Sequence, residues 1–263
     1  MAREIICSSG DRPWEEKKLT RIVGSDDLAG LISAADRLRR GAVIAAPADS
    51  GWAILCDPFN EKAAHRVGAL GSGGFPPALV VSSPVEWRRW AYAPPHPGVD
   101  DLLDEVWPGP LEIIARARRT LPAWMTSDDG TVTVAHPDRR SLNLLSVYSG
   151  LPLACAFVEK AGAGEGAAEN AAETAVENLG EGSGENRAAG GFGPAAPDAV
   201  MMSPGRGADI VIKGERSGRE RTTGIGTVVD LTGRRPVLVR EGDVLADAVR
   251  RRIPDLDDSV TMR

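Results

Sequence analysis

The sequence has few cysteines, no long apolar run and no excess of positive charge. Its three cysteines, Cys7, Cys56 and Cys155, lie far apart, which argues against a zinc knuckle or a disulfide framework and indicates buried thiols in a reducing compartment. Nowhere do about 18 apolar residues follow one another, so we expect no transmembrane helix. The N-terminal segment has no apolar core of signal-peptide length, and we therefore expect a cytoplasmic protein.

The charge balance limits the partners of the chain. Lysine and arginine number 31 against 37 aspartate and glutamate, which gives a formal net charge of -6 at pH 7. A chain of this charge has no global positive field that would attract nucleic acid or an anionic membrane. We therefore expect tRNA binding to be weak or absent, and no membrane partner.

The length and the hydrophobic pattern predict an α/β fold. A chain of 263 residues with 42% hydrophobic content can bury one substantial core. Apolar runs of strand length occur at 43–46, 78–81, 111–115, 131–134, 153–157, 210–212, 227–231 and 237–239. Helical spacing occurs at 28–38, 61–70, 99–106 and 141–149. Their alternation predicts a twisted mixed sheet with flanking helices in a single domain.

An acidic segment interrupts this pattern. From Glu159 to Arg187 the composition changes to Ala, Glu, Gly and Asn, and seven glutamates against Lys160 and Arg187 give a local charge of -5. Such a segment has too little apolar surface to fold alone. We therefore predict an insertion at about 161–204, which is a candidate binding segment for a protein partner. The remaining limits are an N-terminal extension at 1–24, the domain at 25–244 and a C-terminal tail at 245–263.

Five motifs occur along the chain in an order that resembles a known family. They are Pro47-Ala-Asp49-Ser-Gly-Trp52-Ala-Ile-Leu-Cys-Asp57-Pro58, Trp107-Pro-Gly-Pro-Leu111, Thr131-Val-Thr-Val134, Gly226-Thr-Val-Val-Asp230-Leu-Thr-Gly233 and Arg240-Glu-Gly242. In content and spacing this set is similar to the YrdC family of threonylcarbamoyladenylate synthases, over about Asp27 to Val244 apart from the insertion. The first motif departs from the family's Pro-Thr-(Asp/Glu)-Thr-x-Tyr pattern.

The resemblance implies the YrdC-type fold and a nucleotidyltransferase reaction. ATP, L-threonine and bicarbonate would give threonylcarbamoyl-AMP and pyrophosphate, for modification of tRNA. ATP and Mg²⁺ are the expected cofactors if the family activity is retained, and otherwise none. Because negative charge develops on the triphosphate, such a site needs cations or hydrogen-bond donors around it.

The family's charged and hydroxyl contacts to ATP are replaced in this sequence. The Lys-x-Arg position reads Gly71-Ser72-Gly73, the strand arginine is Ala135, the Ser-x-Asn loop reads Cys155-Ala156-Phe157-Val158, and the late serine is Gly226. Losing one charged contact to phosphate costs on the order of 2–4 kcal/mol of transition-state stabilisation. We therefore expect little of the family's synthase activity.

Several residues are candidates for a retained pocket, although no catalytic residue and no metal site is assigned. The candidates are Pro47, Asp49, Ser50, Trp52, His136, Arg140, Thr227 and Arg240. Asp49 and Trp52 would orient a small amino acid, or would serve as a turn former and a core residue. His136 would act as an acid or base with Arg140, or would lie in a surface loop.

Three classes of function follow. The first is a YrdC-family protein that resembles the synthases and binds a nucleotide and an amino acid, with its synthase activity in question. The second is a repurposed carbamoyl- or nucleotidyl-transfer enzyme that uses Asp49, Trp52, His136 and Arg140 on another substrate. The third is a non-catalytic ligand-binding or regulatory homologue. Binding of ATP and threonine distinguishes the first from the others, and binding without turnover marks the third.

Overall fold

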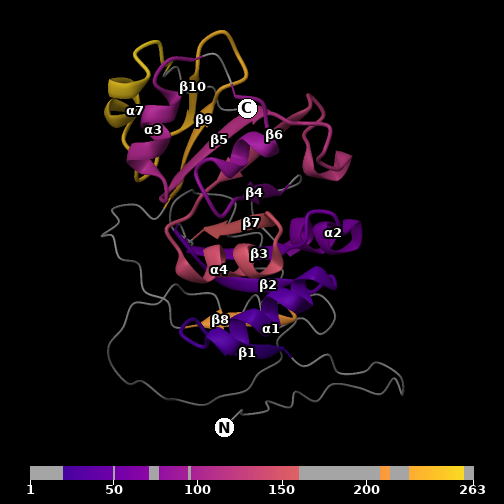
Figure 1. The fold of residues 1–263 in the computed structure, drawn as a ribbon. Helices are drawn as coiled ribbons and strands as arrows, with labels where there is room; N and C mark the ends of the chain where they lie inside the picture. Colours follow the sequence, from indigo (N-terminus) through magenta and orange to yellow (C-terminus); the bar gives the residue numbers. More distant parts are fainter. Residues whose placement is uncertain are drawn as a thin grey trace, which may run out of the picture.

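The computed structural model describes residues 20–49, 51–70, 77–93, 96–159, 208–213 and 225–257. Within these ranges ten strands form one twisted mixed sheet in the order β1-β8-β2-β3-β7-β4-β6-β5-β9-β10 (Figure 1). Helices pack against the sheet, so the predicted α/β class with a mixed sheet and flanking helices is confirmed.

The strands are β1 (Arg21–Gly24), β2 (Ile44–Ala48), β3 (Gly51–Cys56), β4 (Ala78–Val80), β5 (Leu111–Arg116), β6 (Thr131–Ala135), β7 (Leu153–Glu159), β8 (Ile210–Lys213), β9 (Thr227–Asp230) and β10 (Val237–Arg240). The helices are α1 (Leu28–Arg39), α2 (Glu61–Leu70), α3 (Val99–Val106), α4 (Arg140–Ser149) and α7 (Ala246–Arg252), with short 3₁₀ turns η1 (Glu86–Arg89) and η2 (Ala123–Met125). The acidic segment predicted at 161–204 lies outside the described residues.

Each face of the sheet has its own hydrophobic core, because successive side chains of a strand point to opposite faces. In β2, Ala45 belongs to the core that α2, α3 and α7 cover, whereas Ala46 belongs to the core beneath α1 and α4. Helix α1 shows how the sequence produces this packing. Its side chains Leu31, Ala34, Ala35 and Leu38 are buried at helical spacing, and the Asp27 side chain caps its first turn by accepting a hydrogen bond from the Gly30 N–H.

The segment after Val43 differs from the sequence prediction. We expected a strand at 43–46 followed by a loop, but β2 continues to Ala48 and turns at once into β3, so that Pro47 pairs with Trp52. Pro47 is tolerated because the described β8 pairs with β2 only at Ile44 and Ala45, where a backbone N–H is available.

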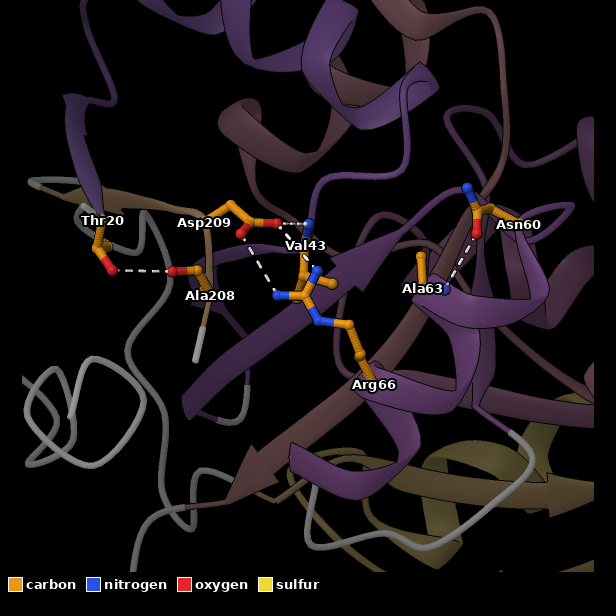
Figure 2. A network of polar contacts seen from close by, with 7 residues as sticks. All are labelled: Thr20, Val43, Asn60, Ala63, Arg66, Ala208 and Asp209. Atoms are coloured by element: carbon orange, nitrogen blue, oxygen red, sulfur yellow. Dashed lines mark hydrogen bonds and ion pairs between the residues drawn. The ribbon is translucent and has the colours of Figure 1, made fainter. Parts of the chain in front are cut away.

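A partly buried polar network fixes β8 beside β2 (Figure 2). Asp209, directly before β8, accepts a hydrogen bond from the Val43 N–H at 2.8 Å. The two carboxylate oxygens of Asp209 also accept hydrogen bonds from Arg66 of α2, at 3.2 and 3.4 Å. The Thr20 hydroxyl donates to the Ala208 carbonyl at 3.0 Å. These contacts hold the start of β8 to β2, to α2 and to the residue before β1.

Helix α7 packs against α3 near the C-terminal end of the described chain. Gly98 caps α3 with a φ of 82°, and a Cβ atom at this position would overlap the backbone carbonyl of Arg252 at the end of α7. The Arg252 guanidinium also donates to the Glu105 carboxylate of α3 at 2.6 Å. Two elements beyond the expected domain limits, β1 and α7, are thus in contact with the rest of the fold.

Candidate functional site

A small cavity, partly open to solvent, lies on the sheet face that α1 and α4 cover. It is lined by residues of several strands and of the loops that join them: Asp49, Gly109, Pro110, Leu111, Glu112, Ala135, Pro137, Phe157 and Gly226. Trp107 sets the shape of the turn at its wall, because its indole N–H donates to the Leu111 carbonyl at 2.7 Å and the Gly109 N–H donates to the His136 carbonyl at 2.9 Å.

Asp49 is the lining residue that sequence reasoning identified. It directly follows β2 and is only 6% exposed. One carboxylate oxygen lies 3.3 Å from the Nε of Arg139, which is also buried, and the other accepts a hydrogen bond from the Asp138 N–H at 2.8 Å. The pair therefore ties the end of β2 to the loop between β6 and α4, and Arg139 compensates the charge of the carboxylate.

Glu112 of β5 is a second carboxylate in the lining. Its Oε1 lies 3.2 Å from an Nη atom of Arg240, and the Nε of Arg240 donates to the Gly226 carbonyl at 2.8 Å. A Cβ atom built on Gly226 would lie 2.8 Å from the same Glu112 oxygen, closer than Cβ atoms come to other heavy atoms. Glu112 thus occupies the space that a side chain at position 226 would need.

These contacts decide the electrostatic character of the cavity. Both charged side chains of its lining are carboxylates, and each has an arginine as its ion-pair partner. Among the described residues, no lysine or arginine lines the cavity. The walls therefore offer hydrogen-bond acceptors and apolar surface, and the positive charges are held in ion pairs.

His136 is buried beside the cavity between two lining residues, Ala135 and Pro137. Its Nδ1 lies 2.8 Å from the Val81 carbonyl, which can only accept a hydrogen bond, so Nδ1 carries the proton. Its ring meets the Trp107 ring edge-on, with centroids 6.1 Å apart. Burial lowers the pKa of His136 below its ordinary value of 6.5, although its hydrogen bond to Val81 and the nearby carboxylates oppose this.

The lowered pKa of His136 predicts a loss of stability in mild acid. The unfolded chain, with the ordinary pKa of about 6.5, takes up the proton first, so the contribution of His136 is complete above that pH and is lost as the pH falls toward the folded-state pKa. We expect the melting temperature to fall more steeply between pH 7.5 and 5.5 in the wild type than in His136→Asn, whose side-chain amide keeps a donor for Val81. Parallel melting profiles for the two proteins would contradict this assignment.

Other predicted pocket residues have structural positions. Trp52 is buried in the core on the opposite sheet face, and its indole N–H has no hydrogen-bond acceptor among the described residues. Pro47 is buried in β2. The Thr227 hydroxyl donates to the Val244 carbonyl and accepts from the Gly242 and Val244 N–H groups. Its hydrogen-bonding capacity is therefore used in joining β9 to the segment after β10.

The last three predicted pocket residues are Arg240, Arg140 and Ser50. Arg240 adjoins it through Glu112 and Gly226. Arg140, the first residue of α4, is exposed and does not line it. Ser50 lies outside the described residues.

Three of the replaced family positions, Ala135, Phe157 and Gly226, line the cavity. Cys155 and Ala156 are buried and do not line it, and Gly71 and Gly73 lie outside the described residues. Sequence reasoning missed Glu112 and the role of Arg139. A signal for Glu112 was present, since it is an acid within the predicted strand 111–115, directly after the Trp-Pro-Gly-Pro-Leu motif.

The described residues contain no cluster of three or more His, Cys, Asp or Glu side chains that could hold a metal ion. Cys56 and Cys155 are free and buried, and burial raises the pKa of Cys56 to about 12. A thiol with this pKa is a poor nucleophile and a poor metal ligand. In the described part of the chain, each helix is too short or too polar to span a bilayer.

Comparisons with known proteins agree on one family. The model of the Sua5, YciO and YrdC proteins, described as "Telomere recombination", matches residues 36–180. Threonylcarbamoyl-AMP synthase of Pseudomonas putida strain W619 is 33% identical over 113 residues, which cover 41% of this chain and 61% of that relative. The chain thus matches about three fifths of the length of this relative.

Two solved structures share the fold. P. abyssi Sua5, crystallised in complex with L-threonine, superposes with a TM-score of 0.66 at 19% identity, over 90% of this chain and 62% of that one. E. coli YciO superposes with a TM-score of 0.61 at 21% identity, over 86% of this chain and 97% of that one.

Proposed function

The chain belongs to the Sua5, YciO and YrdC family, and we propose that it is a small-molecule-binding member with a synthase rate far below that of relatives that keep the family's phosphate contacts. One observation supports this proposal above the others. The cavity that contains the replaced positions is lined by two carboxylates, and by no lysine or arginine among the described residues.

The proposed loss of rate follows from the charge of the reaction. Threonylcarbamoyl-AMP synthesis would bring a triphosphate into the cavity and add negative charge to the α-phosphate in the transition state, where positioned cations supply much of the stabilisation. Here the nearest arginines are paired with Asp49 and Glu112. Mg²⁺ would have to arrive with the triphosphate, because among the described residues no group of three or more His, Cys, Asp or Glu side chains could hold a metal ion by itself.

A small amino acid fits the same lining better than ATP. An ionised carboxylate has about four acceptor positions, so Asp49 and Glu112 can accept further hydrogen bonds from an ammonium group. The turn at Trp107–Leu111 keeps the cavity wall in place. L-threonine, which is bound in the P. abyssi relative, is the first ligand to test. Weak tRNA binding and a protein partner for residues 161–204 stay predictions, since the described residues do not test them.

The test is the release of pyrophosphate from ATP in the presence of both L-threonine and bicarbonate. We expect a turnover at least about 100-fold below that of the P. putida synthase assayed in parallel, because each lost contact to the transition state costs about 10²-fold or more. Calorimetric titration with L-threonine tests ligand binding separately. A turnover equal to that of the P. putida enzyme would refute the proposed loss of activity.

A further inference from the structure

We infer that Glu112 is a specificity-determining residue, which makes the cavity reject phosphate groups by holding the charge of Arg240 in an ion pair. This role rests on the proposed function, since it requires the cavity to be a ligand site. It goes further by assigning the rejection of phosphate to one side chain. Replacement of the family's contacts alone would weaken phosphate binding, whereas Glu112 opposes it actively.

The position of Arg240 is the first support. Its Nε donates to the Gly226 carbonyl and an Nη atom lies 3.2 Å from Glu112 Oε1, so it contacts two of the residues that line the cavity. Its side chain is 39% exposed, whereas that of Glu112 is 12% exposed. Without the Glu112 charge, Arg240 would keep its bond to the Gly226 carbonyl, and its positive charge beside the cavity would no longer be balanced by Glu112.

The fit between positions 112 and 226 is the second support. A Cβ atom at 226 would lie 2.8 Å from the Glu112 carboxylate and 3.6 Å from the Arg240 guanidinium. The Glu112 carboxylate can therefore lie beside Arg240 only because residue 226 is a glycine and has no side chain in that space. The missing hydroxyl at 226 and the carboxylate at 112 are thus coupled, and together they replace a donor by an acceptor in the cavity wall.

The total charge around the cavity is the third support. The other lining carboxylate, Asp49, is ion-paired with buried Arg139, so each lining carboxylate has an arginine partner. Neutralising Glu112 alone would make the wall more positive by one charge. In a partly buried site such a charge attracts phosphate strongly, because the local dielectric constant is lower than that of water.

A purely structural role for Glu112 makes a different prediction. The Glu112–Arg240 pair joins β5 to β10 across β9. If it serves only to hold these strands together, its loss would lower the melting temperature and leave the preference for ligands unchanged. Ligand affinity therefore separates the two roles.

The test compares full-length wild type, Glu112→Gln and Glu105→Gln by calorimetric titration with inorganic pyrophosphate at fixed ionic strength. Glu105 forms an exposed ion pair with Arg252 and does not line the cavity, so its variant changes the net charge by the same amount elsewhere. We expect Glu112→Gln to bind pyrophosphate at least tenfold more tightly than the wild type, and Glu105→Gln to bind as the wild type does. No gain in Glu112→Gln, or an equal gain in Glu105→Gln, would overturn the inference.

Two further arms complete the experiment. If Glu112→Gln does not fold, Gly226→Ser takes its place, because its side chain displaces the Glu112 carboxylate from Arg240 and the same gain is expected. Wild-type titration with L-threonine tests the proposed ligand independently. Threonine binding without a gain in pyrophosphate affinity rejects the role of Glu112 alone, and a gain without threonine binding rejects the proposed ligand alone.

Discussion

Asp49→Ala is expected to lower the free energy of unfolding by about 3–5 kcal/mol, because it removes one partner of a buried ion pair and leaves the Arg139 guanidinium without the Asp49 charge. Both partners are 6% exposed, so water cannot replace the lost carboxylate. The part-buried Asp138 N–H loses its acceptor in the same variant, which adds a smaller cost. The measurement is a guanidinium chloride titration of wild type and variant.

A double variant separates charge from packing at this site. In Asp49→Ala with Arg139→Met, no buried charge is left, so part of the lost stability should return. Asp49→Asn keeps the shape and an acceptor but loses the charge, and we expect an intermediate loss. A change below about 1 kcal/mol in Asp49→Ala, which is typical of an exposed ion pair, would show that the pair is open to solvent.

Gly98→Ala is expected to cost about 2–5 kcal/mol, the sum of left-handed backbone strain and of a steric overlap that the fold has little room to relieve. Gly98 has a φ of 82°, and its Cβ would overlap the backbone carbonyl of Arg252. The obstacle is main chain rather than a flexible side chain, so α7 would have to move away from α3. Denaturant titration and thermal melting both measure this loss.

Gly150→Ala is the matched control. Gly150 ends α4 with a φ of 69°, and its Cβ would meet no atom within 4 Å. It therefore carries the backbone strain without the overlap, and we expect a loss of about 1–2 kcal/mol. Equal losses in the two variants would mean that α7 does not pack on Gly98 in solution.

The fold was largely predictable because its local signals agree with the final packing. The apolar spacing predicted α2 and α3 with the bounds that the structure has, since both helices bury one continuous face. Strand β3 was missed because Pro47 and Gly51 are typical of loops. The structure uses them at a sharp turn between paired strands, where Gly51 has a φ of 131°.

The site was less predictable because its decisive contacts join distant parts of the chain. Asp49 could be found from its motif, but its partner Arg139 comes from the loop after β6. Glu112 and Arg240 are 128 residues apart. Nothing local indicates that these side chains meet, since the ion pair depends on β9 lying between β5 and β10. Electrostatic pairing across a sheet becomes visible only when the strand order is known.

The position of β8 has a consequence for synthesis on the ribosome. Strand β8 lies between β1 and β2, yet it is made only after residues 160–207, whereas β1 is made first of all the strands described. Until residues 208–213 emerge, β1 lacks the neighbour to which it is hydrogen-bonded, and β2 presents an open edge that could pair with another nascent chain. Strand β1 can therefore pair with β8 only after nearly two hundred further residues have been made. Asp209 then fixes the start of β8 to Val43, directly before β2.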